Sequence, residues 1–190
     1  MRKMNKAIIV ICSCLILGTA AINTQAGDYQ VKRYPLAGHG YLQVRMPILW
    51  TDHVKQPPDN LPPTITFTAR NGNPFVILLT PIWAMDKRPP LSLVEMRAHV
   101  AQAAEHAQAQ AVETHIAVQT LTGQSGKGYY FQATDRAPKP DEYKYITQGF
   151  VQVGKLPVAF TILTNDGQEV IQSQALGLIA GLEYQAQHNK

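Results

Sequence analysis

The segment YKYITQGFVQVGKLPVAFTILT, residues 143–164, is the longest stretch of strand-forming sequence in this chain. Two apolar-rich runs, Tyr143 to Val153 and Val158 to Thr164, lie on either side of Gly154-Lys155-Leu156-Pro157. β-Branched and aromatic residues favour strands, and such a short connection joins antiparallel neighbours. The segment therefore predicts a long antiparallel hairpin.

Six shorter strands are predicted before this hairpin. Each is an apolar or alternating run bounded by residues that favour turns, and Asn71-Gly72 is typical of a tight hairpin turn. The run Phe75 to Leu79 is continuously apolar, which predicts a central strand covered on both faces. The six expected strands are Tyr29 to Leu36, Tyr41 to Met46, Thr64 to Ala69, Phe75 to Ile82, His115 to Leu121 and Gly128 to Thr134.

A helix is predicted from Leu93 to Val112. Ser92 is suited to be its N-cap residue, and Glu95, three residues later, completes a capping box. Small and apolar residues recur on one face, which predicts burial of a mostly alanine stripe against a sheet. The stripe comprises Leu93, Met96, Val100, Ala104, Ala107 and Ala111.

A second helix is predicted towards the C-terminus. Asp166 and Glu169 have the spacing of another capping box, and apolar residues recur at helical spacing from Ile171 to Leu182. Gly177 and Gly181 are four residues apart, a spacing that favours close packing of the helix on the sheet. Together with the short connections between strands, these helices predict an α+β sandwich, an antiparallel β-sheet flanked by helices.

The first 26 residues have the pattern of a secretory signal peptide. Residues 2–6 carry three basic side chains, residues 7–17 are apolar apart from one serine, and residues 24–26 offer a small-x-small cleavage site. The apolar run is shorter than the roughly 20 residues of a membrane-spanning helix. We therefore expect a cleaved leader, a periplasmic or secreted location, and no transmembrane segment in the mature chain.

The expected mature part, residues 27–190, is a single domain whose composition differs from that of the whole chain. The leader holds both cysteines, three of the 17 basic residues and no acidic residue, so the net charge falls from +4 to +1 without it. A domain without cysteine is stabilised by its core alone. Near-neutrality removes the electrostatic argument for nucleic acid, which we do not expect as a partner. A lipoprotein acylated at Cys14 is the less favoured alternative.

No intact catalytic motif occurs in this domain. Gly123 to Gly128 resembles the end of a phosphate-binding loop, but that pattern needs glycine at Leu121 and serine or threonine at Gly128. Ser125 lacks the glycine that a nucleophile elbow requires two residues later, because Lys127 stands there. We expect a hairpin turn here, no catalytic residue and no cofactor.

Three side chains of the first predicted helix form an alternative metal site. Glu95 and His99 are four residues apart, and His106 follows seven residues later, so all three approach one side of the helix. The same side lies opposite the alanine stripe, where solvated residues are expected. We therefore favour a solvated face and keep metal binding as the alternative.

Aromatic and basic residues on neighbouring predicted strands form the best candidate for a binding surface. Tyrosine rings offer stacking area, and arginine or lysine side chains attract an anionic partner. Alternation along a strand sends part of the aromatic set into the core, so only some of these residues are available for binding. The candidates are Tyr130, Tyr143, Tyr145, Arg136 and Lys144.

The order of the elements and one short motif resemble the PsbP-like superfamily, which includes the exported DcrB-like proteins of bacteria. Residues 42–47, LQVRMP, followed by Trp50, are similar to that family's strand ending in Pro-x-x-Trp. Leu49 stands where the family often has glycine. The resemblance implies an α/β/α sandwich used for binding or assembly, and it carries over no catalytic residue. We also expect Trp50 to be a core residue at the end of a strand.

Together these features predict a small, exported, non-enzymatic protein of the bacterial envelope that acts by binding another protein or a small ligand. The alternative is a metal-dependent or other hydrolytic enzyme of the periplasm. The proline-rich segment Pro57 to Pro63 is expected to be a stiff connector, because proline fixes φ and removes an amide donor. A third hypothesis is that the protein is a subunit of an envelope assembly, with this segment, Tyr130 or Tyr143 as its contact surface.

Overall fold

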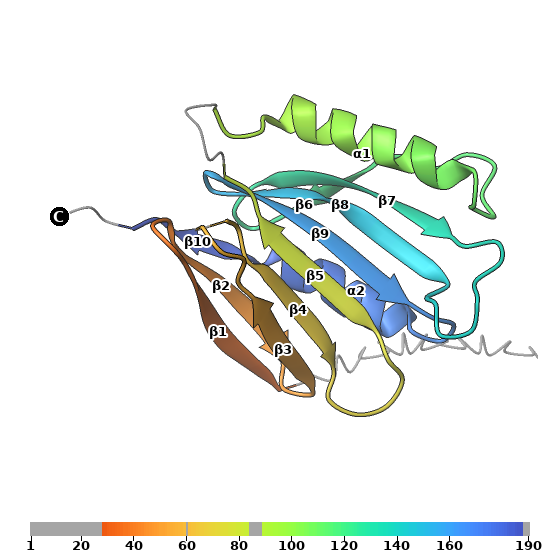
Figure 1. Ribbon diagram of the computed structural model, residues 1–190, viewed down its shortest axis with the longest axis horizontal. Helices are drawn as coiled ribbons and strands as arrows, with labels where there is room; N and C mark the ends of the chain where they lie inside the picture. The colour runs from red at the N-terminus through yellow and green to blue at the C-terminus, as the bar shows by residue number, and fades with distance from the viewer. Residues whose placement is uncertain (1–27, 60, 84–88, 188–190) are drawn as a thin grey trace, which may run out of the picture.

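The computed structural model of the protein describes residues 28–59, 61–83 and 89–187, so the predicted leader lies outside the described residues. It is an α+β structure with ten strands in this part of the chain (Figure 1). The strands are β1 (Tyr29–Leu36), β2 (Gly40–Pro47), β3 (Trp50–Lys55), β4 (Thr64–Ala69), β5 (Val76–Pro81), β6 (Gln119–Thr122), β7 (Lys127–Thr134), β8 (Tyr145–Val153), β9 (Leu156–Thr164) and β10 (Glu183–Gln185). The helices are α1 (Leu93–Gln108) and α2 (Glu169–Ala180).

The strands form two antiparallel sheets. The large sheet has seven strands in the order β3-β4-β5-β9-β8-β7-β6, and the small sheet has three in the order β1-β2-β10. The prediction of an α+β fold with mainly antiparallel strands is thus confirmed, but a second sheet was not anticipated. Because β10 follows α2 directly and pairs with β2, the C-terminal part of the domain closes onto its N-terminal hairpin.

The predicted hairpin of residues 143–164 is confirmed as β8 and β9. These strands pair from Tyr145 opposite Thr164 to Val153 opposite Leu156. β9 also pairs with β5, and β8 also pairs with β7, so the hairpin joins the two halves of the large sheet. The central position predicted for β5 is confirmed, but Ile77 and Leu79 on one face are fully buried while Leu78 on the other is half-buried.

The helices lie on opposite faces of the large sheet (Figure 1). α1 packs on β7 and β8, whereas α2 packs on β9 and β2. One core fills the space between the two sheets and includes Ala175 and Ile179 of α2. A second, smaller core joins the alanine stripe of α1 to Phe131 and Ala133 of β7.

The start of α1 agrees with the sequence prediction, but its end does not. The Ser92 backbone N–H donates to the Glu95 carboxylate at 2.7 Å, and the Ser92 hydroxyl accepts from the Glu95 backbone N–H at 3.3 Å, which is a capping box. The helix ends at Gln108, before the predicted Val112. The Gln108 side chain accepts from the Ile116 backbone N–H at 3.1 Å, and the chain beyond it turns back along β7.

The second capping box was predicted wrongly. The N-cap residue of α2 is Gln168, and its side chain makes no capping hydrogen bond. The Asp166 carboxylate instead accepts hydrogen bonds from Lys144 and Tyr145. The Asp166 side chain, which the local spacing had assigned to the helix terminus, therefore bonds to residues more than 20 positions earlier in the sequence. The apolar stripe predicted for this helix is confirmed at Ala175 and Leu178, which are buried; Ile171 is half-buried, and the buried Leu182 lies after the helix ends at Ala180.

Two strands were not predicted, and one begins later than expected. β3 has a single buried residue, Trp50, so it lacks the alternation that identifies a half-buried strand. β10 has only three residues and depends on its pairing with β2. The strand expected from His115 begins at Gln119.

Candidate binding site

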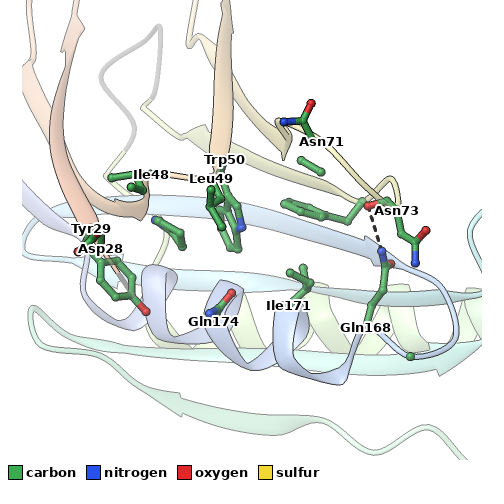
Figure 2. Close-up of a pocket in the computed structure, with 14 residues that line it drawn as sticks. Asp28, Tyr29, Ile48, Leu49, Trp50, Asn71, Asn73, Gln168, Ile171 and Gln174 are labelled. Carbon is green, nitrogen blue, oxygen red and sulfur yellow. Dashed lines mark hydrogen bonds between the residues drawn. The ribbon is translucent and has the colours of Figure 1, made fainter. Parts of the chain in front are cut away.

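A hollow of about 470 Å³ lies where the β2–β3 turn, the β4–β5 loop and the beginning of α2 meet (Figure 2). We call it the corner pocket. Its lining residues are Asp28, Tyr29, Pro47, Ile48, Leu49, Trp50, Ala69, Asn71, Asn73, Phe75, Gly167, Gln168, Ile171 and Gln174.

The wall formed by the β2–β3 turn is unusually apolar for an exposed connection. The chain leaves the small sheet at Pro47 and enters the large sheet at Trp50. Backbone hydrogen bonds hold this turn, from Ile48 N to Asp28 O at 2.9 Å and from Arg70 N to Leu49 O at 3.0 Å. The Ile48 and Leu49 side chains remain 39% and 72% exposed. Two neighbouring apolar side chains in one turn thus face solvent beside a hollow.

The aromatic residues of the corner pocket are preorganised by the core. Trp50 and Phe75 are 3% and 2% exposed, with ring centroids 4.9 Å apart and an interplanar angle of 58°. Their rings belong to the core between the sheets and form a fixed apolar base beneath the hollow. Ile171 adds an apolar side chain from α2. The pocket is therefore a preformed apolar hollow, the usual character of a small-molecule or side-chain binding site.

Gln168 fixes the geometry of the corner pocket. Its side chain is buried, and its Nε2 donates to the Asn73 carbonyl at 3.3 Å (Figure 2). The same atom donates to the Pro74 carbonyl at 3.1 Å. Its Oε1 accepts from the Asn165 backbone N–H at 2.8 Å. These bonds tie the β4–β5 loop to the start of α2. Gln168 thus acts as a structural residue whose amide is already engaged.

The chemistry of the corner pocket suits binding. Among its lining residues there is no serine, cysteine, histidine or lysine, so they supply no activated nucleophile of those types. The side chains of Asn71, Asn73 and Gln174 offer neutral donors and acceptors around the apolar centre, and Asp28 adds one carboxylate. This arrangement holds an apolar group and orients it through hydrogen bonds at the rim.

Of the residues predicted for binding, Lys144 and Tyr145 lie in one polar cluster with Asp166. Lys144 Nζ lies 2.9 Å from Asp166 Oδ1, and Tyr145 Oη donates to the same oxygen at 2.6 Å. The hydrogen bonds from Tyr145 and Lys144 lower the pKa of Asp166. Asp166 in turn raises the pKa of Lys144 and that of Tyr145. The cluster satisfies its own charges and leaves little attraction for an anionic ligand.

Two of the other predicted binding residues, Tyr143 and Arg136, lie close to this cluster, and Tyr130 does not. Tyr143 and Lys144 line a smaller hollow of about 230 Å³ beside the C-terminal end of α1, and Arg136 lines an adjoining one of about 420 Å³. The Arg136 guanidinium donates to the Ala111 carbonyl at 2.6 Å, which gives it a structural role. Tyr130 faces the core between the sheets, where its ring lies 6.5 Å from that of Phe160. The structure thus brings Tyr143, Lys144 and Arg136 near one another and separates Tyr130 from them, so the predicted aromatic platform is not continuous.

The three residues of the alternative metal site lie on α1, and the described part of the chain brings no further ligand to them. Within the described ranges, no group of three or more histidine, cysteine, aspartate or glutamate side chains is arranged to hold a metal ion. The Glu95 carboxylate accepts from Ser92, and these hydrogen bonds lower the pKa of Glu95. The His99 ring lies 6.2 Å from the Phe150 ring. His106 is exposed in the last turn of the helix.

The corner pocket was not among the sites predicted from sequence, although four of its residues, Pro47 to Trp50, form the Pro-x-x-Trp motif. Ile48 and Leu49 fall inside the Pro-x-x-Trp motif, which indicated only a resemblance to a family. Consecutive apolar residues in a turn were the available indication, since turns favour polar residues. The hollow itself depends on the β4–β5 loop and α2, which local sequence does not place.

Comparisons with known proteins show the fold alone. No family model and no curated protein matches the chain. One similar solved structure is a protein from Bacteroides thetaiotaomicron VPI-5482, with a TM-score of 0.50 and 10% sequence identity. The alignment covers 86% of this chain and 50% of that one, so this chain spans about half the length of its structural neighbour. Separately, among the described residues no helix is both long and apolar enough to cross a membrane.

Proposed function

We propose that this protein is an exported, non-enzymatic binding protein of the bacterial envelope, and that the corner pocket receives an apolar group of its ligand or partner. The observation that carries this proposal is the exposure of Leu49 and Ile48 at the edge of a preformed apolar hollow. Exposed apolar side chains cost hydration free energy unless a partner covers them.

The N-terminal sequence, the arrangement of the helices and the lining of the pocket support the same proposal. The N-terminal sequence has the pattern of a signal peptide, and the helices on opposite faces of the large sheet are compatible with a PsbP-like α/β/α sandwich, which we propose as the family. Proteins of that family are expected to act by binding or assembly. The lining of the corner pocket, with neutral amides around apolar side chains, suits that role.

A neutral fluorescent probe tests the pocket directly. N-phenyl-1-naphthylamine becomes brighter when it enters an apolar site, so its titration into the mature domain measures binding. Leu49→Asp is expected to weaken probe binding about tenfold, because a charge is placed at the apolar wall. Leu49 is mostly exposed, so this change leaves the free energy of unfolding within about 0.5 kcal/mol of the unchanged protein.

The matched control is Val94→Asp on α1. Val94 is 79% exposed and does not line the corner pocket, so its substitution adds the same charge elsewhere. Equal probe binding by both variants would contradict the assignment of the pocket. Circular dichroism on the same samples shows whether an unfolded fraction contributes to the fluorescence.

A further inference from the structure

A second hollow of about 470 Å³ continues from the corner pocket along α2. The two hollows share Tyr29 and Gln174. Figure 2 shows these two residues next to each other, beyond Ile171 and away from Gln168. The second hollow lies against the C-terminal half of α2 and against side chains of β1 and β2. Together they make one groove, which we call the α2 groove.

The α2 groove has an extended form. Pro47 of β2 lies at the corner-pocket end, and Gln43, four residues earlier in the same strand, lies at the other end. At the usual rise of a strand this separation is about 13 Å. On the opposite wall, α2 and its two capping residues contribute lining residues from Gln168 to Gly181. A groove between a strand and a helix that run side by side matches an extended chain better than a compact ligand.

Gly177 keeps the floor of this groove open. A Cβ atom on Gly177 would meet no heavy atom of the described chain within 4 Å, so packing does not require glycine here. The sequence prediction that Gly177 serves close packing of α2 on the sheet is therefore wrong. Glycine inside a helix costs about 1 kcal/mol relative to alanine. Its position in the groove allows the backbone of a ligand to approach the helix closely.

Arg45 provides a charge in the middle of the groove. Its guanidinium carbon lies 4.5 Å from the centre of the Tyr29 ring, and within the described residues it forms no ion pair. Glu183, the other charged residue of the second hollow, accepts a hydrogen bond from Gln43 at 3.0 Å. Asp28 lies in the corner pocket and disfavours an acidic group there. The charges therefore favour an acidic group beside Arg45 and an apolar group in the corner pocket.

We propose that the α2 groove binds an extended peptide segment of a partner protein, with an apolar side chain in the corner pocket and an acidic side chain two residues away at Arg45. This inference rests on the proposed binding function. Arg45 and Pro47 are two residues apart in β2, and alternate side chains of an extended peptide are about 7 Å apart in the same way. The neutral amides of Gln124 and Gln174 offer donors and acceptors to the peptide backbone, whereas the Gln43 amide is engaged by Arg33 and Glu183.

Two other ligand classes fit the groove less well. A fatty acyl chain prefers an enclosed apolar site, whereas amide side chains occur along the whole α2 groove. A sugar is commonly held by an exposed aromatic face, but Trp50 is buried and the Tyr29 ring carries Arg45 on it. Dodecanoate and an oligosaccharide represent these two classes in the binding experiment.

Fluorescence anisotropy with a labelled hexapeptide containing Leu-Ser-Glu tests the inference. The mature domain is expected to bind this peptide, and Arg45→Glu is expected to weaken binding about tenfold. The same variant is expected to prefer a peptide with Leu-Ser-Lys, which a merely structural role of Arg45 would not produce. Gly177→Leu fills the groove and weakens binding of both peptides. Val170→Leu, at a 68% exposed position of α2 that does not line the groove, leaves binding unchanged.

The outcomes separate this inference from the proposed function. Binding of N-phenyl-1-naphthylamine that depends on Leu49, without binding of any hexapeptide, overturns the peptide inference and leaves the pocket proposal standing. Arg45-dependent binding of dodecanoate or of an oligosaccharide, with no peptide binding, also overturns it. The peptide inference is also overturned if the Arg45→Glu and Gly177→Leu variants bind the peptide as tightly as the unchanged protein does. Thermal melts of every variant show whether it is folded.

Discussion

The Tyr34 hydroxyl of β1 donates a hydrogen bond to the Asp52 carboxylate of β3, with 3.0 Å between Tyr34 Oη and Asp52 Oδ2. This bond joins the edge strand of the small sheet to the edge strand of the large sheet. Asp52 also forms an ion pair with Lys32 of β1. Burial, with a smaller contribution from Asp52, raises the pKa of Tyr34, so the hydroxyl keeps its proton. The two sheets are therefore held together by a polar contact as well as by their core.

Removing the Tyr34 hydroxyl is expected to lower stability moderately. Tyr34→Phe keeps the buried ring and its edge-on contact with Phe67. The ion pair between Asp52 and Lys32 also remains. The loss of a hydrogen bond to a charged group lowers the free energy of unfolding by about 1.5–3 kcal/mol. Urea unfolding followed by circular dichroism measures this change. The control is Tyr41→Phe, whose hydroxyl has no side-chain hydrogen bond among the described residues; an equal loss in both variants would contradict the assigned role.

The Asp166 cluster predicts a specific pH dependence. A depressed pKa means that the contribution of Asp166 to stability is present above its ordinary value of 3.8 and is lost as the pH falls through its folded-state pKa. For Lys144, whose pKa is raised, the contribution is present below 10.5 and is lost as the pH rises through the folded-state pKa. Asp166→Asn should therefore reduce the acid dependence of the free energy of unfolding.

A double-mutant cycle tests whether the Asp166 carboxylate and Lys144 cause this pH dependence. Lys144→Ala, Asp166→Asn and the double variant are unfolded in urea at acidic and neutral pH. We expect a coupling between the two sites at neutral pH that disappears in acid. A coupling that stays constant with pH would show that the carboxylate charge is not its cause.

The capping box of α1 predicts a helix-specific effect. Ser92→Ala removes the hydroxyl that accepts from the Glu95 backbone N–H, and it is expected to lower the free energy of unfolding by about 1 kcal/mol. Ser173→Ala, at an exposed position within α2, is the matched control and should change stability little. Amide hydrogen exchange in the first turn of α1 should become faster in the Ser92 variant alone.

The close approach of β7 and β8 predicts a severe effect at Gly149. A Cβ atom there would lie 2.2 Å from the Tyr129 carbonyl oxygen and 2.6 Å from Tyr130 Cβ, so Gly149→Ala forces these strands apart. We expect a loss of about 3 kcal/mol or more in the free energy of unfolding. Gly177→Ala, with open space around the new methyl group, should instead raise stability by about 1 kcal/mol. Similar melting temperatures for the two variants would refute this packing.

The sequence predicted local structure well where the relevant contacts are local. The β8–β9 hairpin depends on neighbouring residues, and the Ser92 capping box lies within four residues. β10 depends on pairing with β2, more than a hundred residues earlier in the chain, and no local pattern encodes that contact. Asp166 shows the same limit, because its carboxylate accepts from Lys144 and Tyr145 of a distant strand region rather than from the helix terminus.

The site was less predictable than the fold for the same reason. Tyr130 and Tyr143 were correctly placed on or beside strands, but alternation and strand order send them to different surfaces. Ile48 and Leu49 lie in the corner pocket, which forms only when the β4–β5 loop and α2 close around their turn. The pocket therefore depends on the relative placement of three segments that are separated in the sequence.

Because three segments meet at the corner pocket, a bound ligand would connect them. A molecule seated there touches the end of the small sheet, the β4–β5 loop of the large sheet and the first turns of α2 at once. It would therefore slow local opening of all three, and at a hundred times its Kd it would add about 2.7 kcal/mol to the stability of the folded state. A ligand that occupies the corner pocket is thus expected to raise the melting temperature in a thermal-shift screen.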